Sequence, residues 1–254
     1  ERKHQVISTD TIIIAKDHKN TSKVSFDGNT SVQVMLDGYT GLGLAMAQTN
    51  SEHVDIQIAL KEFVGPATER NPDVLIKGDA ALQIRNAVRG LGWHYEPSLE
   101  NRWPHNAVME RWIQTIKSVI RAVNLQGGAP YKAWDGSLPY SSVALAITKP
   151  ATILPHERKA NGEILPGSPK IGKSCWEMFH GEKFDGPIQP YLRLCYYRDP
   201  EAHPLQAKTK AGFFMGWKLE PGMRYRGVLK VLDYELVQKG VFTNNRIASV
   251  PQKE

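Results

Sequence analysis

The run from Ala107 to Asn124 constrains the fold more than any other feature, because its apolar side chains recur every three or four residues. This spacing predicts an amphipathic helix with a broad apolar stripe, and Gly127-Gly128 is expected to end it. Such a helix has to cover another layer of structure, which the rest of the chain must supply. The stripe is formed by Met109, Trp112, Ile113, Ile116, Val119, Ile120 and Val123.

The first part of the chain supplies that layer as a series of predicted strands. Gln5–Ala15, Ser31–Leu36 and Leu42–Gln48 are short segments rich in residues that favour strands. Polar turn sequences separate them, one around Asp27-Gly28-Asn29 and one beginning at Asp37-Gly38. Three consecutive strands joined in this way indicate an antiparallel meander.

A first helix is expected directly after the meander, from Ser51 to Val64. Ser51 is of the type that caps helix N-termini. Val54, Ile58 and Phe63 follow at roughly helical spacing and are expected to form the apolar face.

Two further strands and a second helix are expected before the long helix. Asp73–Ile76 is a short apolar run typical of a buried strand. Ala80–Gly90 predicts a helix with Gly90 as its C-cap, and Trp93–Pro97 a fifth strand. The apolar positions of this helix are Leu82, Ile84 and Val88.

The order strand meander, helix, strand, helix, strand, long helix is that of an α/β, ribonuclease H-like core, a mixed five-stranded sheet flanked by helices. We assign this core to residues 1–150, with a further helix at Ser141–Ile147. Residues 151–173, rich in Pro, Gly and charge, are expected to be a linker. Residues 174–254 contain short alternating segments and are expected to form a small basic β-rich domain.

Three acidic residues fall at places that such a core would bring together. Asp10 and Asp79 lie on or just after the first and fourth strands, which are neighbours in this architecture, and Glu110 lies one turn inside the long helix. Carboxylates from three elements supply the hard oxygen ligands that two Mg²⁺ or Mn²⁺ ions need for in-line attack at phosphorus. Taken singly, an Asp at a strand end is more often a turn or cap residue, and a Glu in the first turn of a helix is more often a helix-dipole partner.

Asp37 competes with Asp10 for the first position, because it also ends an apolar strand. Choosing Asp37 would leave one strand too few before the first helix, so Asp10 is preferred. Asp37 is then a turn residue beside Gly38.

Positive charge is concentrated near the end of the chain. The net charge is +6, and the stretch from Arg193 to Lys230 is rich in basic residues interleaved with aromatic ones. Such a mixture suits DNA, through phosphate contacts and stacking platforms; a solvated face on a small β-domain explains it equally well. The candidate DNA-binding residues here are Lys208, Lys210, Arg224 and Arg226.

Composition narrows the setting. Two cysteines, Cys175 and Cys195, are too few for a disulfide scaffold, and the sequence has no apolar run of the roughly 20 residues that a membrane-spanning helix requires. The opening residues lack the pattern of a secretory signal and an initiator Met, so we expect a piece of a longer protein that is neither secreted nor membrane-bound.

One motif carries a specific resemblance. Pro104-His-Asn-Ala-Val-Met-Glu110-Arg111 resembles the P-x-x-N-G-x-x-E-R signature at the catalytic glutamate of retroviral and retrotransposon integrases, with Ala107 in place of Gly. Upstream, Val74–Asp79 resembles the strand that ends in the second catalytic Asp of the family, and Leu36–Gly41 resembles its second-strand turn.

The resemblance extends over nearly the whole chain. Cys175–Met178, Leu192–Tyr197 and Lys208–Trp217 are similar, in the same order, to the region that follows the core in copia-type elements. Two features depart from the family pattern. Asp79 is followed by Ala80-Ala-Leu-Gln where the family has polar residues, and the family's His/Cys zinc module is absent from this sequence.

The resemblance implies a copia-type integrase from a Pol polyprotein, a polynucleotidyl transferase in which Asp10, Asp79 and Glu110 bind two Mg²⁺ or Mn²⁺ ions. Such an enzyme trims a DNA 3′ end and joins it to target DNA. Lys117, two helical turns after Glu110, matches a basic position that contacts the DNA end, and Arg111 is a further candidate contact. A homo-oligomer bridging two DNA ends, in the nucleus or an intracellular virus-like particle, is also implied.

Two alternatives remain open at this point. A ribonuclease H-like nuclease or transposase would use the same acids and metals. A catalytically inactive, DNA-binding remnant of a retroelement would use the basic carboxyl-terminal segment, and the alanine after Asp79 is a departure of the kind that a decayed copy would carry.

Overall fold

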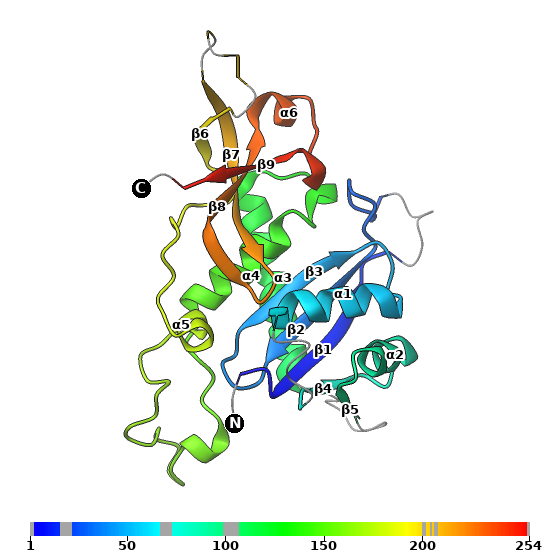
Figure 1. Ribbon diagram of the computed structural model, residues 1–254, viewed down its shortest axis with the longest axis vertical. Helices are drawn as coiled ribbons and strands as arrows, with labels where there is room; N and C mark the ends of the chain where they lie inside the picture. Colours follow the sequence, from blue (N-terminus) through cyan, green and yellow to red (C-terminus); the bar gives the residue numbers. More distant parts are fainter. Residues whose placement is uncertain are drawn as a thin grey trace.

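Two sheets organise the chain in the computed structural model, which describes residues 3–15, 22–66, 73–98, 107–199, 202–203, 205 and 208–252. One sheet has five strands in the order β3-β2-β1-β4-β5, and the other has four in the order β6-β7-β8-β9 (Figure 1). The five-stranded sheet is mixed and flanked by helices, and the four-stranded sheet is antiparallel. This is the α/β fold class that the sequence predicts.

The predicted meander is present as β1 (Val6–Ile13), β2 (Ser31–Asp37) and β3 (Gly43–Gln48), which pair antiparallel in that order. Every residue of β2 is buried, because helices cover both faces of the sheet at this central strand. Alternate side chains of β2 therefore enter two different hydrophobic clusters, Met35 on one face and Val34 on the other.

The other two strands of this sheet run parallel to β1. β4 (Leu75–Gly78) pairs with β1, and β5 (His94–Pro97) pairs with β4. Helix α2 (Leu82–Gly90) connects β4 to β5, as a parallel pair requires a crossover rather than a tight turn.

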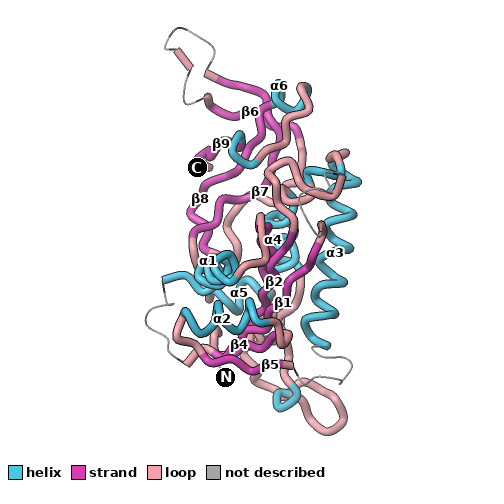
Figure 2. The backbone as a smooth tube through the Cα atoms, turned by 90° about the vertical axis from the view of Figure 1, so that its right-hand side faces the viewer, coloured by secondary structure: helices cyan, strands magenta, loops and turns pink. Residues whose placement is uncertain are grey.

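Helices cover the two faces of the five-stranded sheet. Figure 2 shows α1 (His53–Val64) and α2 on one side of it and α3 (Ala107–Gly127) on the other. On the α3 face, Met109, Trp112 and Ile116 pack against β2 and β3. The long amphipathic run is thus a helix that covers the sheet, as its spacing predicts.

Four details of the predicted helices are wrong. Helix α1 begins at His53 after Glu52, so Ser51 is not its cap, and its buried stripe is Ile56, Ala59, Leu60 and Phe63 while Val54 and Ile58 are about half exposed. Both stripes have helical spacing, and the sheet selects the one with more apolar surface. In α2, Leu82 is exposed, and Leu91 rather than Gly90 is the C-cap, because Gly92 supplies the positive φ that ends this helix.

Helix α4 (Ser137–Thr148) lies between the two sheets and packs against β3, α3 and β7. Its Ser142 hydroxyl accepts a hydrogen bond of 3.0 Å from the backbone N–H of Ala45 in the edge strand β3. Its Tyr140 ring stacks on Trp217 of β7, with ring centroids 5.3 Å apart. Phe214 and Trp217 belong to the same hydrophobic cluster as Ile7 of β1, so a continuous core reaches both sheets.

The carboxyl-terminal sheet is built from a long hairpin and two flanking strands. Its elements are β6 (Leu194–Arg198), β7 (Thr209–Glu220), β8 (Arg224–Asp233) and β9 (Ile247–Pro251). Short helices complete the described chain, namely α5 (Cys175–His180), α6 (Tyr234–Gln238) and the 3-10 turns η2 (Tyr131–Ala133), η3 (Pro155–Glu157) and η4 (Asn244–Arg246). Within the described residues, no helix has the length and apolarity needed to cross a membrane.

The segment between α4 and α5 contains a buried ion pair. The Lys170 ammonium lies 2.9 Å from the Glu157 carboxylate and donates to the Thr152 carbonyl at 3.0 Å. It also lies 4.0 Å from the centre of the Tyr39 ring, in the turn after β2. This lysine therefore fastens the connecting segment to the core.

Candidate active site

The register between β1 and β4 aligns Asp10 with Asp79. Ser8 pairs with Lys77 in the parallel ladder, so two residues further along Asp79 lies opposite Asp10. Neighbouring strands are roughly 4.8 Å apart. Asp10 is half-buried within β1, and Asp79 is exposed one residue beyond the end of β4. Two acids that lie far apart in the sequence are thus brought close together on neighbouring strands.

Alternation along β1 directs Asp10 toward α3. Asp10 shares its face with Ile12, because side chains two residues apart point the same way, and Ile12 packs with Met109 and Ile116 of α3. Glu110 follows Met109 in the first turn of α3. The third predicted acid therefore lies on the helix that covers the Asp10 face.

The charges of three predicted residues act on the carboxyl of the fourth, Asp10. Burial raises the pKa of the Asp10 carboxyl, the backbone N–H of Thr11 lowers it through a 2.7 Å hydrogen bond, and the negative charges of Asp79 and Glu110 raise it. Lys117 acts in the opposite sense and lowers the pKa of Asp10. The structure thus brings Asp79, Glu110 and Lys117 within electrostatic range of Asp10.

The donor chemistry of this cluster fits a hard divalent cation. Carboxylates are the ligands that Mg²⁺ and Mn²⁺ prefer, and a cation would relieve the like-charge repulsion that Asp79 and Glu110 exert on Asp10. Across the described residues, no three His, Cys, Asp or Glu side chains already lie close enough together to hold a metal ion. The acids form an electrostatic cluster rather than a closed coordination shell.

Tyr95 is a neighbour of the site that the sequence did not single out. Its hydroxyl donates a hydrogen bond to the backbone carbonyl of Asp79, and Asp79 Oδ1 accepts from the N–H of Ala80 at 2.7 Å. Burial raises the pKa of Tyr95, Arg85 lowers it, and Asp79 raises it. The one available signal was that Tyr95 falls in the strand predicted to lie beyond the one ending at Asp79.

A side-chain network fixes β1 from its other face. The Gln33 amide donates to the Thr9 hydroxyl at 2.6 Å, and its carbonyl accepts from the Thr11 hydroxyl at 2.7 Å. Thr9 in turn donates to the backbone carbonyl of Val34 at 2.8 Å. Thr9 and Thr11 flank Asp10, so these bonds hold the strand that carries the first acid.

Asp37 is a turn residue, as predicted. Its side chain is fully buried and accepts three hydrogen bonds, from the His4 N–H at 2.7 Å, the Thr40 N–H at 2.8 Å and the Thr40 hydroxyl at 2.7 Å. It lies opposite Ile7 in the sheet, three residues from Asp10 along β1. The carboxylate is occupied in closing the turn and takes no part in the acidic cluster.

The other predicted DNA-binding residues do not lie together. Arg111 is exposed on α3 beside Glu110. Lys208 is exposed, and Lys210, at the start of β7, forms a 2.7 Å ion pair with Asp199. Arg224 and Arg226, at the start of β8, both pair with Glu220, at 3.6 and 2.8 Å. The length of β7 separates the two groups by roughly 33 Å, so the basic stretch is divided between the two ends of the hairpin.

Sequence comparisons assign no family to these residues. A scan against protein-family models finds no match, and a search of curated proteins finds none either. Of the motif that carries the integrase resemblance, Ala107–Arg111 are part of α3, whereas residues 104–106 lie outside the described residues. The chemistry of the site is therefore inferred from the side chains that the fold brings together.

Proposed function

We propose that this chain is a metal-dependent polynucleotidyl transferase, the catalytic core of an integrase that processes DNA 3′ ends and joins them to target DNA. The observation that supports it most is the β1–β4 register, which sets Asp79 beside Asp10, together with the effect of Glu110 on the same carboxyl. Three acids from three elements are the donor set that two-metal phosphoryl transfer uses.

Each residue has a defined task in this proposal. Asp10, Asp79 and Glu110 would hold two Mg²⁺ or Mn²⁺ ions. When bound, the ions supply Lewis acidity at the attacked phosphodiester and activate the attacking water or 3′ hydroxyl. Lys117, whose positive charge acts on Asp10, would bind a DNA phosphate beside the acids. Tyr95 is a positioning residue, since it holds the backbone of Asp79.

Joining two DNA ends to a target also calls for a homo-oligomer that bridges both ends. This part of the proposal, like the nuclear or virus-like-particle location, rests on the resemblance of the Glu110 motif and the downstream segments to copia-type elements. The net charge of +6 suits a protein that handles DNA.

The test is a strand-transfer assay with oligonucleotides that carry the element's ends, in Mg²⁺ or Mn²⁺. We expect Glu110→Gln to lower joining by at least about a hundredfold, because it removes several kcal/mol of metal-dependent stabilisation. Glu235→Gln is a matched control, since Glu235 also lies in the first turn of a helix but belongs to the other sheet region. Undiminished joining in the Glu110→Gln protein would refute the assigned chemistry.

The products of the same assay separate the alternatives. A ribonuclease H-like nuclease or transposase would use the same three carboxylates, and hydrolysis without joining would identify a nuclease. Salt-sensitive DNA binding that is indifferent to metal and to Glu110→Gln would instead identify an inactive, DNA-binding remnant.

A further inference from the structure

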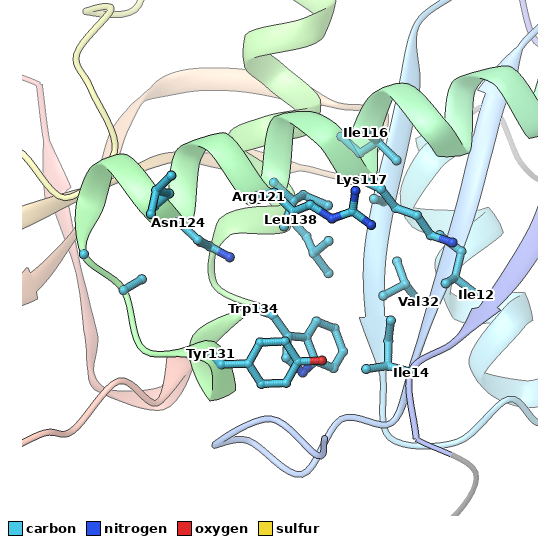
Figure 3. A pocket seen from close by; sticks show the side chains of 15 residues that line it. Ile12, Ile14, Val32, Ile116, Lys117, Arg121, Asn124, Tyr131, Trp134 and Leu138 are labelled. Atoms are coloured by element: carbon cyan, nitrogen blue, oxygen red, sulfur yellow. The ribbon is translucent and has the colours of Figure 1, made fainter. Parts of the chain in front are cut away.

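An apolar groove runs along α3 on the same face of the sheet as Asp10. Its volume is about 560 Å³, within the range of small-molecule sites. Ile12 and Val32 of the sheet, with Ile14 just after β1, form one side, and the second half of α3 with the turn before α4 forms the other (Figure 3). The helix therefore leaves part of the sheet face open just beyond the acids.

One end of the groove lies near Asp10. Ile12 lies two residues after Asp10 on the same face of β1, and Lys117, whose charge acts on Asp10, is itself a lining residue. Figure 3 shows Lys117 and Arg121 reaching from α3 toward the end where Ile12 lies. Lys117 thus links this end of the groove to Asp10, and Arg121 follows it one turn further along α3.

The far side of the groove is aromatic. The Tyr131 side chain is 65% exposed, and its ring lies beside Trp134 on the wall opposite the two cations (Figure 3). Trp134 is held in place, since its indole N–H donates to the Lys23 carbonyl at 3.2 Å. Asn124 also lines the groove, and its buried side-chain oxygen has no hydrogen-bond partner among the described residues.

We propose that this groove binds an unpaired nucleotide of a DNA strand whose phosphodiester lies at the acids. Its phosphate would contact Lys117 and Arg121, its base would pack against Tyr131 and Trp134, and the Asn124 amide would meet the base edge. The charge layout favours this occupant over an apolar peptide, because two cations lie on the α3 wall and two aromatic rings on the wall facing it (Figure 3). The inference rests on the proposed function, and it adds a strand-end specificity that the acids do not provide.

The test measures binding of the full chain to short fluorescent duplexes in EDTA, so that it needs no catalysis. One duplex is blunt and the others carry a dinucleotide overhang at the 5′ or the 3′ end. The wild-type protein should prefer an overhang. Tyr131→Ala should weaken binding of that duplex about five- to tenfold, the low end of the range for loss of a base-stacking ring, and Tyr131→Phe should retain it. Circular dichroism of each variant verifies that it is folded.

A matched control separates the groove from general DNA binding. Tyr196 is also strongly exposed but lies on β6 in the other sheet, so Tyr196→Ala should change blunt and overhang binding by the same factor. Equal affinity of the wild-type protein for blunt and overhang duplexes, or equal losses for both in Tyr131→Ala, would overturn the proposal. The proposal would also be overturned if the protein forms a dimer that Leu125→Asp abolishes. In that case a second copy of the chain would cover the groove.

Failure of the proposed function would look different. In that case the overhang preference would persist in EDTA and in the Glu110→Gln protein, while no joining would occur in metal. If only the groove proposal fails, joining is retained and the overhang preference is absent.

Discussion

Replacing Gly43 by alanine tests whether the site depends on the packing of α3 against the sheet. A Cβ at Gly43 would lie 2.4 Å from two ring carbons of Trp112, which is 3% exposed. Ordinary carbon contacts are about 3.5 Å or longer, so the indole would have to move by about 1 Å. Overpacking of this kind costs about 1–3 kcal/mol. Because Glu110 precedes Trp112 by half a turn of the same helix, we also expect DNA joining to fall by about a hundredfold, the loss that a 1 Å misplacement can cause.

Urea denaturation gives the free energy of unfolding, and the strand-transfer assay gives the activity. Gly90→Ala is the control, since its Cβ would lie 2.0 Å from the amide nitrogen of Gln57, the mobile end of a flexible side chain, and should cost less than about 1 kcal/mol. Adding Trp112→Phe to Gly43→Ala should recover part of the loss, so that the two changes are not additive. A Gly43→Ala protein with wild-type stability and activity would refute the reasoning.

Two further outcomes are expected. Folding raises the pKa of Asp10 above its ordinary value of 3.8, so its contribution to stability is fully present below about pH 3.8 and is lost as the pH rises through the folded-state pKa. Asp10→Asn should therefore unfold less readily than wild type at neutral pH, with the difference vanishing in acid, and Mg²⁺ should raise the melting temperature of wild type only. Lys170→Met should lower the free energy of unfolding by about 3–5 kcal/mol, because it leaves the mostly buried Glu157 carboxylate without its cationic partner, with only the Leu154 N–H as a donor. Adding Glu157→Leu should restore most of that loss in urea denaturation, and a double variant as unstable as the single one would contradict this account.

The sequence predicts the strands and helices of the core well, because apolar residues recur at different spacings in strands and in helices. The β-branched runs before residue 50 and the three- and four-residue spacing after Ala107 each match one regular structure, and the order of elements makes the strands of Asp10 and Asp79 neighbours. Which face of a helix is buried is harder to predict from the sequence. In α1, Val54 and Ile58 have the same spacing as Ile56 and Leu60, and only the sheet beneath determines which pair is buried.

Contacts between distant segments account for the rest of what the sequence left unpredicted. Tyr95 reaches Asp79 through β5, and the groove combines residues of β1, α3 and the turn before α4. The basic residues after Arg193 show the opposite effect. They are close in sequence, but a long hairpin carries Lys210 and Arg226 to opposite ends and gives each an acidic partner. The clustering of basic residues in the sequence therefore predicts a single DNA-binding patch, whereas the fold divides these residues between the two ends of the hairpin.

How closely α3 packs against the sheet sets both the distance between Glu110 and Asp10 and the width of the groove. Trp112 lies against Gly43, and the absence of a side chain at that glycine is what allows the helix to approach. Glu110 precedes the indole by two residues, and Lys117 and Arg121 follow it on later turns. If the helix moved outward, Glu110 would withdraw from Asp10 while the groove widened between Lys117 and the sheet. The proposed joining of DNA ends would need both distances fixed at once, and a single glycine–tryptophan contact would meet that need because both sets of residues belong to one helix.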